Sequence, residues 1–212
     1  MIVGLTGNIA AGKSTVTSIF KELGAHIIDW DELARQVVRP HSKAWKEISE
    51  HFGKGILNVD LTINRQKLAD IVFSNKRELT KLNQIVHPEV FEMDERATNE
   101  IRNRDPDALI IKDIPLLFEV TRPVFVNKVI VVSASEETQL RRLEERGINR
   151  RDAQKRIKCQ LSLEEKIKSA DFVINNDGPL EDTRRQVEDI FCLLRKEEKD
   201  SKRKVREGFH GK

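Results

Sequence analysis

Short apolar blocks alternate with longer amphipathic stretches along the chain. Apolar runs of strand length stand at 1–6, 25–28, 108–114, 128–133 and 171–175. Apolar residues at helical spacing stand between or after them, at 14–23, 31–38, 136–146, 149–162 and 180–195. Short buried strands that alternate with helices are typical of a parallel sheet covered on both faces. The pattern therefore predicts an α/β fold with a three-layer core.

The stretch 38–104 differs, because it has almost no strand pattern and is interpreted as a helical insertion. Gly53-Lys54-Gly55 and the turn-like residues 58–64 interrupt it, and His87-Pro88 is predicted to open a helix that runs to about Arg104. We expect a core of residues 1–37 and 105–195, and a charged tail at 196–212 that is frayed or disordered.

Composition narrows the class of protein. The chain has 212 residues and a formal charge of +3, with basic and acidic residues mixed, which argues against a general polyanion binder. No apolar run approaches the roughly 20 residues of a membrane helix, and the N-terminus resembles no secretion signal. The two cysteines, Cys159 and Cys192, are far apart and are expected to form neither a disulfide scaffold nor a zinc site. We expect a cytoplasmic protein that is a monomer or weak homo-oligomer and binds neither nucleic acid nor membrane.

The strongest local signal is Gly-Asn-Ile-Ala-Ala-Gly-Lys-Ser at 7–14, which matches the phosphate-loop pattern G-x-x-x-x-G-K-[ST]. It follows a predicted strand and precedes a predicted helix, so backbone N–H groups and the helix N-terminus can face an anion. Lys13 is expected to reach the β- and γ-phosphates, and Ser14 to ligate Mg²⁺. The predicted nucleotide-binding residues of this segment are Asn8, Ile9, Ala10, Ala11, Gly12, Lys13, Ser14 and Thr15.

This motif does not by itself fix the reaction. A GTPase would also need Asn-Lys-x-Asp after a strand, and the nearest string, Asn-Lys-Arg-Glu at 75–78, has the wrong acid and lies in the insertion. A nucleic-acid-associated ATPase is a second alternative, suggested by the basic tail, but a charge of +3 without interleaved aromatic residues makes it a poor match.

Two carboxylates follow the second predicted strand. Asp29 and Glu32 have the spacing of a helix capping box. Asp31 stands two residues after Asp29, so on an extended backbone both side chains would point the same way. Ligands collect at the carboxyl ends of parallel strands, where a carboxylate can accept a proton or help to hold Mg²⁺. The residues alone leave open whether Asp31 is catalytic. Asp113, at the end of the third predicted strand, is a further candidate for holding Mg²⁺ through water.

Six arginines fall within sixteen residues, at 141, 142, 146, 150, 151 and 156. Arg142 and Arg146 share one helix face, and Gly147 separates two predicted helices. A helical hairpin rich in arginine suits a lid, at about 140–163, that neutralises charge in a transition state. We therefore predict that Arg142 and Arg146 are catalytic, whereas Arg141 and some of the others lie on a solvated surface.

Taken together, the motifs resemble the dephospho-CoA kinase family over nearly the whole chain, from Ile2 to about Phe191. The resemblance rests on the phosphate loop and on further motifs in the family's order, which are Asp29-Trp30-Asp31-x-x-Ala34-Arg35, Leu82-Asn83-Gln84-Ile85-Val86-His87-Pro88, Ile114-Pro115-Leu116-Leu117-Phe118-Glu119, Arg142-x-x-x-Arg146, Arg156-Ile157-x-x-Gln160 and Ala170-Asp171-Phe172-Val173-Ile174-x-Asn176.

This resemblance implies a P-loop kinase with a helical acceptor-binding insertion and an arginine lid. It implies ATP-dependent, Mg²⁺-assisted phosphorylation of the ribose 3′-hydroxyl group of dephospho-CoA. By position, Asp31 would be the base or would orient the hydroxyl group, and Asn176 would lie near adenine. The substrate-binding residues that it implies are Asp31, Arg35, His87, Leu116, Leu117 and Glu119.

The chain departs from the family's pattern at three places. Asn8 replaces a usual glycine, Ala10-Ala11 replace small Gly or Ser residues, and Trp30 replaces a small residue between the two acids. Trp30 is bulky enough to reshape the wall of an acceptor pocket. A kinase for a nucleoside or nucleotide is the alternative enzyme, and His87-Pro88 is open to a second interpretation as a simple helix start.

Overall fold

The computed structural model describes residues 1–118 and 125–209, and these form two compact units. One unit contains Met1–Ile28 and Asp105–Lys212, and the other is Asp29–Arg104. The sequence had assigned residues 29–37 to the core. They belong instead to the helical unit, because helix α2 (Trp30–Val37) packs on helix α5 (Lys76–Arg104).

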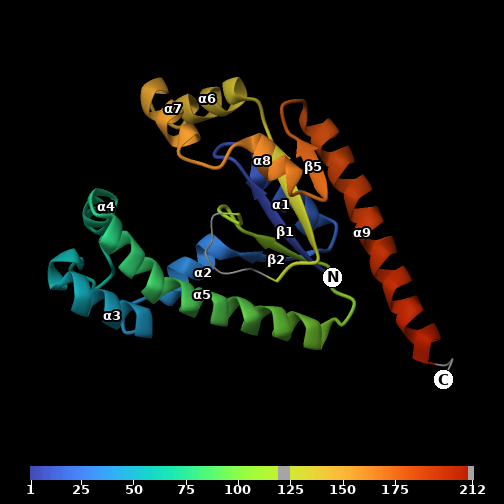
Figure 1. The fold of residues 1–212 in the computed structure, drawn as a ribbon, viewed down its shortest axis with the longest axis horizontal. Helices are drawn as coiled ribbons and strands as arrows, with labels where there is room; N and C mark the ends of the chain where they lie inside the picture. The colour runs from blue at the N-terminus through green and yellow to red at the C-terminus, as the bar shows by residue number, and fades with distance from the viewer. Residues whose placement is uncertain (119–124, 210–212) are drawn as a thin grey trace. The chain divides into compact units, whose positions relative to one another are not determined.

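The first unit is built on a parallel sheet. The strands that the structure describes are β1 (Ile2–Gly7), β2 (His26–Asp29), β3 (Ile110–Asp113), β4 (Lys128–Ser133) and β5 (Phe172–Asn175). They lie in the order β2-β3-β1-β4-β5, and β1 pairs in parallel with both β3 and β4 (Figure 1). The α/β class predicted from the sequence is confirmed.

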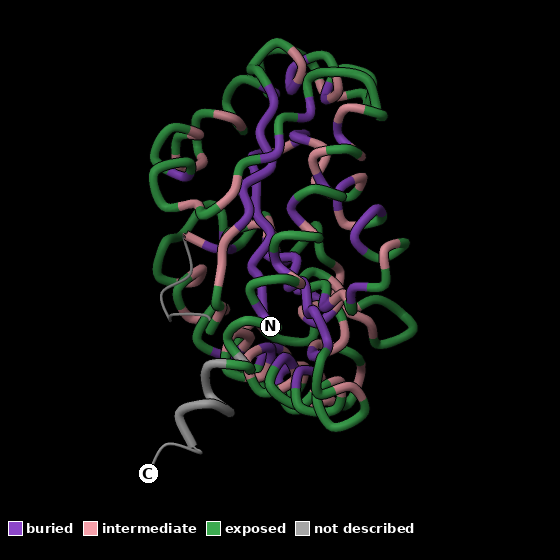
Figure 2. Tube along the Cα trace, turned by 90° about the vertical axis from the view of Figure 1, so that its right-hand side faces the viewer, coloured by how far each residue is buried: buried purple, intermediate pink, exposed green. Residues whose placement is uncertain are grey.

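Helices cover the sheet in layers. Helices α1 (Lys13–Glu22) and α9 (Leu180–Phe209) pack on one face, where Phe20 and Val187 join Leu5 and Ile130 in the core. On the other side of β1, Leu117 packs against Gly4, and α8 (Leu163–Lys168) contacts β4. The central strands are buried along most of their length (Figure 2). In the described part of the chain, no helix is both long and apolar enough to cross a membrane.

Two arginine-rich helices follow β4, namely α6 (Glu136–Glu145) and α7 (Arg150–Lys158). The sequence predicted one helix over 149–162, and α8 was not predicted. The boundary between α7 and α8 has a local cause. Ser162 caps α8 in a reciprocal capping box with Glu165, and this Ser-x-x-Glu signal was present in the sequence.

The second unit is helical, as predicted. It contains α2, α3 (Lys43–Phe52), a 3₁₀ turn (Lys54–Ile56), α4 (Arg65–Ser74) and α5. The expected helix start at His87-Pro88 is wrong, because α5 begins at Lys76 and Pro88 lies inside it. Proline removes one backbone hydrogen bond, but Ile85 and Val90 are buried on either side of it, so tertiary packing holds the helix together.

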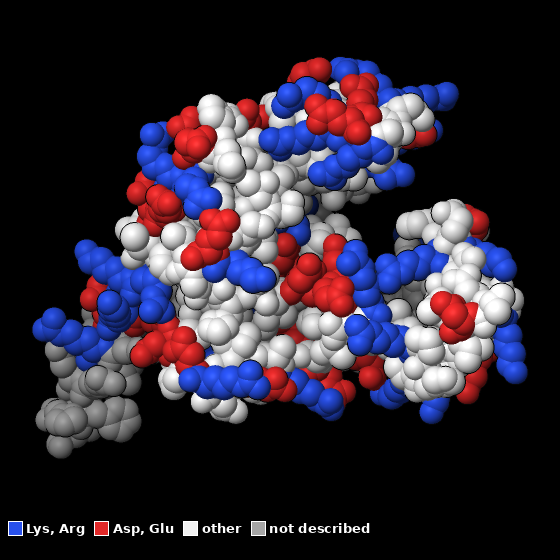
Figure 3. Space-filling model, turned by 180° about the vertical axis from the view of Figure 1, so that it is seen from behind, with Lys and Arg blue, Asp and Glu red and all other residues white. Residues whose placement is uncertain are grey.

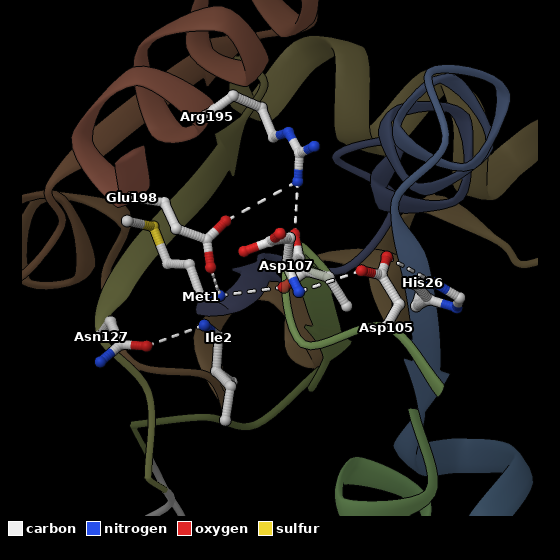
Figure 4. Close-up of polar contacts among 9 residues, drawn as sticks. Met1, Ile2, His26, Asp105, Asp107, Asn127, Arg195 and Glu198 are labelled. Carbon is white, nitrogen blue, oxygen red and sulfur yellow. Dashed lines mark hydrogen bonds and ion pairs between the residues drawn. The ribbon is translucent and has the colours of Figure 1, made fainter. Parts of the chain in front are cut away.

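The predicted end of the last helix at Arg195 is also wrong. Helix α9 continues through the charge run to Phe209, and Glu198 is buried within that run. The Glu198 carboxylate contacts the Met1 α-amino group, which also donates to the Ala108 carbonyl oxygen over 2.9 Å (Figure 4). Arg195 lies 3.7 Å from Glu198 and donates to the Asp107 carbonyl oxygen. These contacts tie the extension of α9 to the start of the sheet.

We predict that Glu198→Ala lowers the free energy of unfolding by about 1–3 kcal/mol, because it removes the anionic partner of a poorly solvated ammonium group and leaves only the Ala108 carbonyl oxygen as its acceptor. The control is Glu197→Ala, on the same helix. Glu197 makes an exposed ion pair with Lys128 at 3.7 Å, which is worth about 0–1 kcal/mol. Urea unfolding of both variants checks the prediction, and equal losses would show that Glu198 does not anchor α9.

Candidate functional site

The loop between β1 and α1 has the shape of a phosphate-binding loop. The predicted residues Asn8, Ile9, Ala10, Ala11, Gly12, Lys13, Ser14 and Thr15 form it and the first turn of α1. Gly12 has a φ of 90° and caps the helix, and Ala10 has a φ of 59° although it is not glycine. A left-handed alanine costs about 1 kcal/mol, so contacts from outside the loop must hold this conformation.

Three side chains from later in the sequence provide those contacts. Arg142 Nη1 donates to the Ala10 carbonyl oxygen over 3.1 Å, and Asn176 Nδ2 donates to the Ala11 carbonyl oxygen over 2.8 Å. Gln160 Oε1 accepts from the Ile9 N–H over 2.7 Å. These contacts bind the Ala10 and Ala11 carbonyl oxygens from outside the loop and so support its conformation.

Asn176 is held from several sides. Its Oδ1 accepts from the Thr183 hydroxyl over 2.8 Å, and its backbone carbonyl oxygen accepts from Arg142 Nη2 over 2.8 Å. Thr183 is completely buried. The Asn176 side chain therefore supports the loop, which is a role that the sequence did not indicate. Its predicted place beside adenine remains a prediction.

Lys13 lies where the motif requires, one residue after Gly12. Its ammonium group contacts the Asp113 carboxylate, whose second oxygen accepts from the Thr17 hydroxyl over 2.9 Å. The Lys13 side chain is 20% exposed and that of Asp113 is 7% exposed. Thr17 was not predicted, although it stands one helical turn after Lys13. Asp113 thus lies beside the loop and balances the charge of Lys13.

The predicted lid is anchored at its base. Leu140, Leu143 and Ala153 of α6 and α7 pack against Ala10 of the loop, with Ile9 at the edge of the cluster. Because apolar contacts join the hairpin to the phosphate loop, a change in the position of one is expected to affect the other.

The arginines of this hairpin differ in burial and in their partners. Arg142 is half-buried against the loop, whereas Arg146 is exposed at the C-terminal cap of α6. Arg150 pairs with Glu137 at 2.9 Å and with Glu144 at 3.5 Å, and opposite charges are mixed over this part of the surface (Figure 3). The expectation of a solvated surface is confirmed for Arg141 and Arg150, which are both exposed.

Asp177 lies between the start of α6 and Asn176. Burial alone would raise the pKa of its carboxyl group. Hydrogen bonds from the backbone and side chain of Ser135 and from Thr138, together with the charge of Arg142, outweigh burial and lower that pKa. Asp177 is therefore expected to stay ionised at neutral pH, next to the cation that holds the loop.

The helical unit has a cavity of its own, of about 490 Å³. This volume is within the usual range for small-molecule sites. The lining of the cavity is mostly apolar and includes three arginines and one carboxylate. The lining residues are Asp31, Ala34, Arg35, Val38, Arg39, Pro40, Ile48, Thr62, Ile63, Arg65, Leu68, Leu82 and Val86. The predicted Asp31 and Arg35 are thus brought together, and Arg39 and Arg65 are additional candidates that the sequence did not identify.

Asp29 and Asp31 are separated by the start of α2. Asp29 is the N-cap, and its carboxylate accepts from the Glu32 N–H over 3.1 Å. Asp31 lies in the first helical turn, so the expectation that both side chains point the same way along an extended backbone is wrong. The capping prediction for Asp29 is confirmed, although the Glu32 carboxylate accepts from Gln36.

Three other predicted acceptor residues, His87, Leu116 and Leu117, do not line this cavity. His87 is half-buried in α5, and burial lowers the pKa of its imidazole. The lower pKa favours the neutral imidazole at pH 7. Leu117 packs against β1 in the first unit, and Leu116 is exposed there. Glu119 lies outside the described residues.

Gly12 and Gly24 offer a matched test of the loop, because their φ values are 90° and 93°. A Cβ at Gly12 would overlap Asn176 Nδ2, whereas a Cβ at Gly24 would meet no atom within 4 Å. We predict that Gly12→Ala abolishes nucleotide binding in calorimetry. Gly24→Ala should cost about 1–2 kcal/mol of stability and leave binding intact. Normal nucleotide affinity in Gly12→Ala would contradict the assigned site.

Comparison with known proteins gives the family. The family model described as dephospho-CoA kinase matches residues 1–182. A dephospho-CoA kinase of Syntrophus aciditrophicus is 41% identical over 208 residues, which are 98% of this chain and 88% of the relative. A solved structure from Thermus thermophilus has a TM-score of 0.77 and 33% identity, covering 92% of this chain and 97% of that one. A dephospho-CoA kinase structure from Campylobacter jejuni has a TM-score of 0.68 and 29% identity, with the same coverage. This chain belongs to the dephospho-CoA kinase family.

Proposed function

We propose that this chain transfers the γ-phosphoryl group of ATP to the ribose 3′-hydroxyl group of dephospho-CoA, with Asp31 as the base and Lys13, Arg142 and Arg146 as charge-stabilising groups. ATP-dependent phosphorylation of dephospho-CoA, a step of coenzyme A biosynthesis, is the activity of the family to which the chain belongs. The assignment of Asp31 is carried by one observation, which is the cavity that Asp31 lines together with three arginines and apolar side chains.

The chemistry of the acceptor matches this cavity. Dephospho-CoA has a pyrophosphate group, a long and largely uncharged pantetheine arm, and an adenosine ribose that is phosphorylated. Arg35, Arg39 and Arg65 can pair with the pyrophosphate, since guanidinium groups bind phosphate oxygens in bidentate fashion. Ile48, Ile63 and Leu68 offer an apolar surface to the arm. A smaller nucleoside would leave much of this surface unused.

Asp31 is suited to the hydroxyl group that is phosphorylated. It is exposed at the cavity in the first turn of α2, whereas Asp29 is engaged as the helix cap. Asp31 can hold the hydroxyl group in line with the γ-phosphorus and accept its proton as the new O–P bond forms and the bond to the ADP oxygen breaks. The departing ADP keeps the electron pair of that bond.

The first unit provides the phosphate side of the reaction. Backbone N–H groups of the loop and the N-terminus of α1 face the bound phosphates, and Lys13 exchanges its contact with Asp113 for a phosphate oxygen. Because Lys13 starts from an ion pair, phosphate binding replaces one anionic partner of Lys13 by another, and the buried Asp113 carboxylate keeps its hydrogen bond from Thr17.

A magnesium ion fits this set of donors. Ser14 is exposed in the first turn of α1, and Asp113 offers carboxylate oxygens, which are the hard ligands that Mg²⁺ prefers. Among the described residues, no group of three or more His, Cys, Asp and Glu is placed to hold a metal, so most ligands would come from phosphates and water. Bound Mg²⁺ would neutralise charge on the β- and γ-phosphates.

We predict that Asp31→Asn lowers the single-turnover rate with dephospho-CoA by about 10²–10⁴-fold, because it keeps the shape of Asp31 but removes the proton acceptor. Asp29→Asn is the control, since asparagine caps helices nearly as well as aspartate. A coupled ADP-release assay measures both variants and tests wild-type protein against nucleoside acceptors. Turnover with a nucleoside alone would reject the proposal, and a slow Asp29→Asn with a normal Asp31→Asn would reverse the two assignments.

Substitutions of Arg142 and Arg146 by alanine should have different effects on ATP binding and on kcat. Arg146 is exposed and can act only when the lid closes, so Arg146→Ala is expected to lower kcat with little change in the Kd for ATP. Arg142 also holds the Ala10 carbonyl oxygen, so Arg142→Ala is expected to weaken ATP binding and lower kcat together. Calorimetry and steady-state kinetics separate the two effects. Identical behaviour of the two variants would show that Arg142 has no special role in the loop.

A further inference from the structure

Helix α2 has two faces with different tasks. Asp31, Ala34, Arg35 and Val38, on one face, line the cavity. On the other face, Trp30, Leu33 and Val37 are buried. Since all of these side chains project from one short helix, its rotation about its own axis decides where Asp31 points.

A polar contact on the buried face fixes that rotation. Trp30 Nε1 donates to Asp94 Oδ1 of α5 over 3.0 Å, and both residues are buried, with 8% and 5% of their surface exposed. The Trp30 ring also meets Phe91 edge to face, with centroids 5.1 Å apart and planes at 86°. Thus Trp30 contacts two residues that lie one turn apart on α5.

Apolar contacts alone would define this rotation less sharply. Leu33 and Val37 can be buried over a range of rotations, because burial of apolar surface is not directional. A hydrogen bond between an indole N–H and a carboxylate is directional, and breaking it inside the protein leaves a buried polar group without its partner. Trp30 precedes Asp31 directly, so little backbone lies between the fixed side chain and the carboxylate.

We propose that Trp30, held by Asp94, is a positioning residue that sets the direction of the Asp31 carboxylate. This inference rests on the proposed role of Asp31. It also corrects the expectation that Trp30 reshapes the wall of the acceptor pocket, because Trp30 does not line the cavity and its indole packs against α5. In this chain, Trp30 positions Asp31 from the buried face of α2.

The test is a double-mutant cycle between Trp30→Phe and Asp31→Asn. Phenylalanine keeps a ring against Phe91 but removes the N–H donor. A misplacement of about 1 Å can cost about 10²-fold in rate, so we expect Trp30→Phe to lower kcat by about 10-fold. In the Asp31→Asn background, Trp30→Phe should cause no further loss, because the carboxylate that it positions is already absent.

A general loss of structure would behave differently, since it would lower the rate by the same factor in both backgrounds. Such multiplicative losses would overturn the proposal, and so would a kcat of Trp30→Phe within twofold of wild type.

Trp45 becomes the remaining tryptophan in Trp30→Phe. Its indole donates to the Leu61 carbonyl oxygen over 2.8 Å, two residues before the cavity residue Ile63, so its fluorescence can report acceptor binding. We expect the Kd for dephospho-CoA to stay within about threefold, because a misdirected Asp31 lowers kcat and leaves ground-state contacts intact.

Asp94→Leu provides a second route if Trp30→Phe does not fold. It removes the acceptor and keeps the indole, and it should lower kcat by a factor that disappears in the Asp31→Asn background. The parent variant separates this inference from the proposed function. If Asp31→Asn is itself near normal, the role of Asp31 is wrong; if it is inactive while Trp30→Phe and Asp94→Leu are normal, only the positioning role is wrong.

Discussion

When a phosphate-binding loop turns its N–H groups toward an anion, its buried carbonyl oxygens need hydrogen-bond partners of their own. In this protein, Arg142 and Asn176 meet that requirement at Ala10 and Ala11. Ala10 adopts a left-handed conformation that alanine disfavours, so the loop depends on these donors more than a glycine-rich loop would. Since Arg142 lies on α6 and Asn176 follows β5, the loop has its shape only after the rest of the unit has folded.

The charge of Lys13 beside the loop is also compensated by a distant residue. Lys13 is paired with Asp113 at the end of β3, and Thr17 holds the second oxygen of that carboxylate. A buried charge without a partner would be costly, so the ion pair offsets the cost of burying both groups. Phosphate binding is then an exchange of partners for Lys13, and Asp113 is left close to the place where a metal with phosphate ligands is expected.

In the helical unit, the decisive element is α2. Its N-cap, Asp29, accepts a hydrogen bond from the backbone, and its buried face is attached to α5 through Trp30. Its other face carries Asp31 and Arg35 to a cavity. Neighbouring residues therefore have unrelated roles, because helical geometry turns each by about 100° from the last. Three consecutive residues thus have three roles: Asp29 caps the helix, Trp30 is the proposed positioning residue, and Asp31 is the catalytic candidate.

The amino-acid sequence by itself determined what depends on local pattern. The strand, loop and helix around Gly7 to Ser14 followed from spacing, as did the parallel sheet and the helical insertion, because apolar periodicity and glycine positions act over a few residues. It also identified the capping role of Asp29, since a capping residue bonds to its own helix.

Only the tertiary structure decided which residues meet across long separations. Pro88 lies inside a helix because the buried residues on either side outweigh its local cost. The charge run after Arg195 continues α9 because Glu198 meets the Met1 amino group, 197 residues away in sequence. Thr17, Gln160 and Thr183 joined the site for the same reason, and Trp30 turned from the cavity because its partner is Asp94 on another helix. Such contacts depend on the packing of whole elements, which short-range periodicity does not encode.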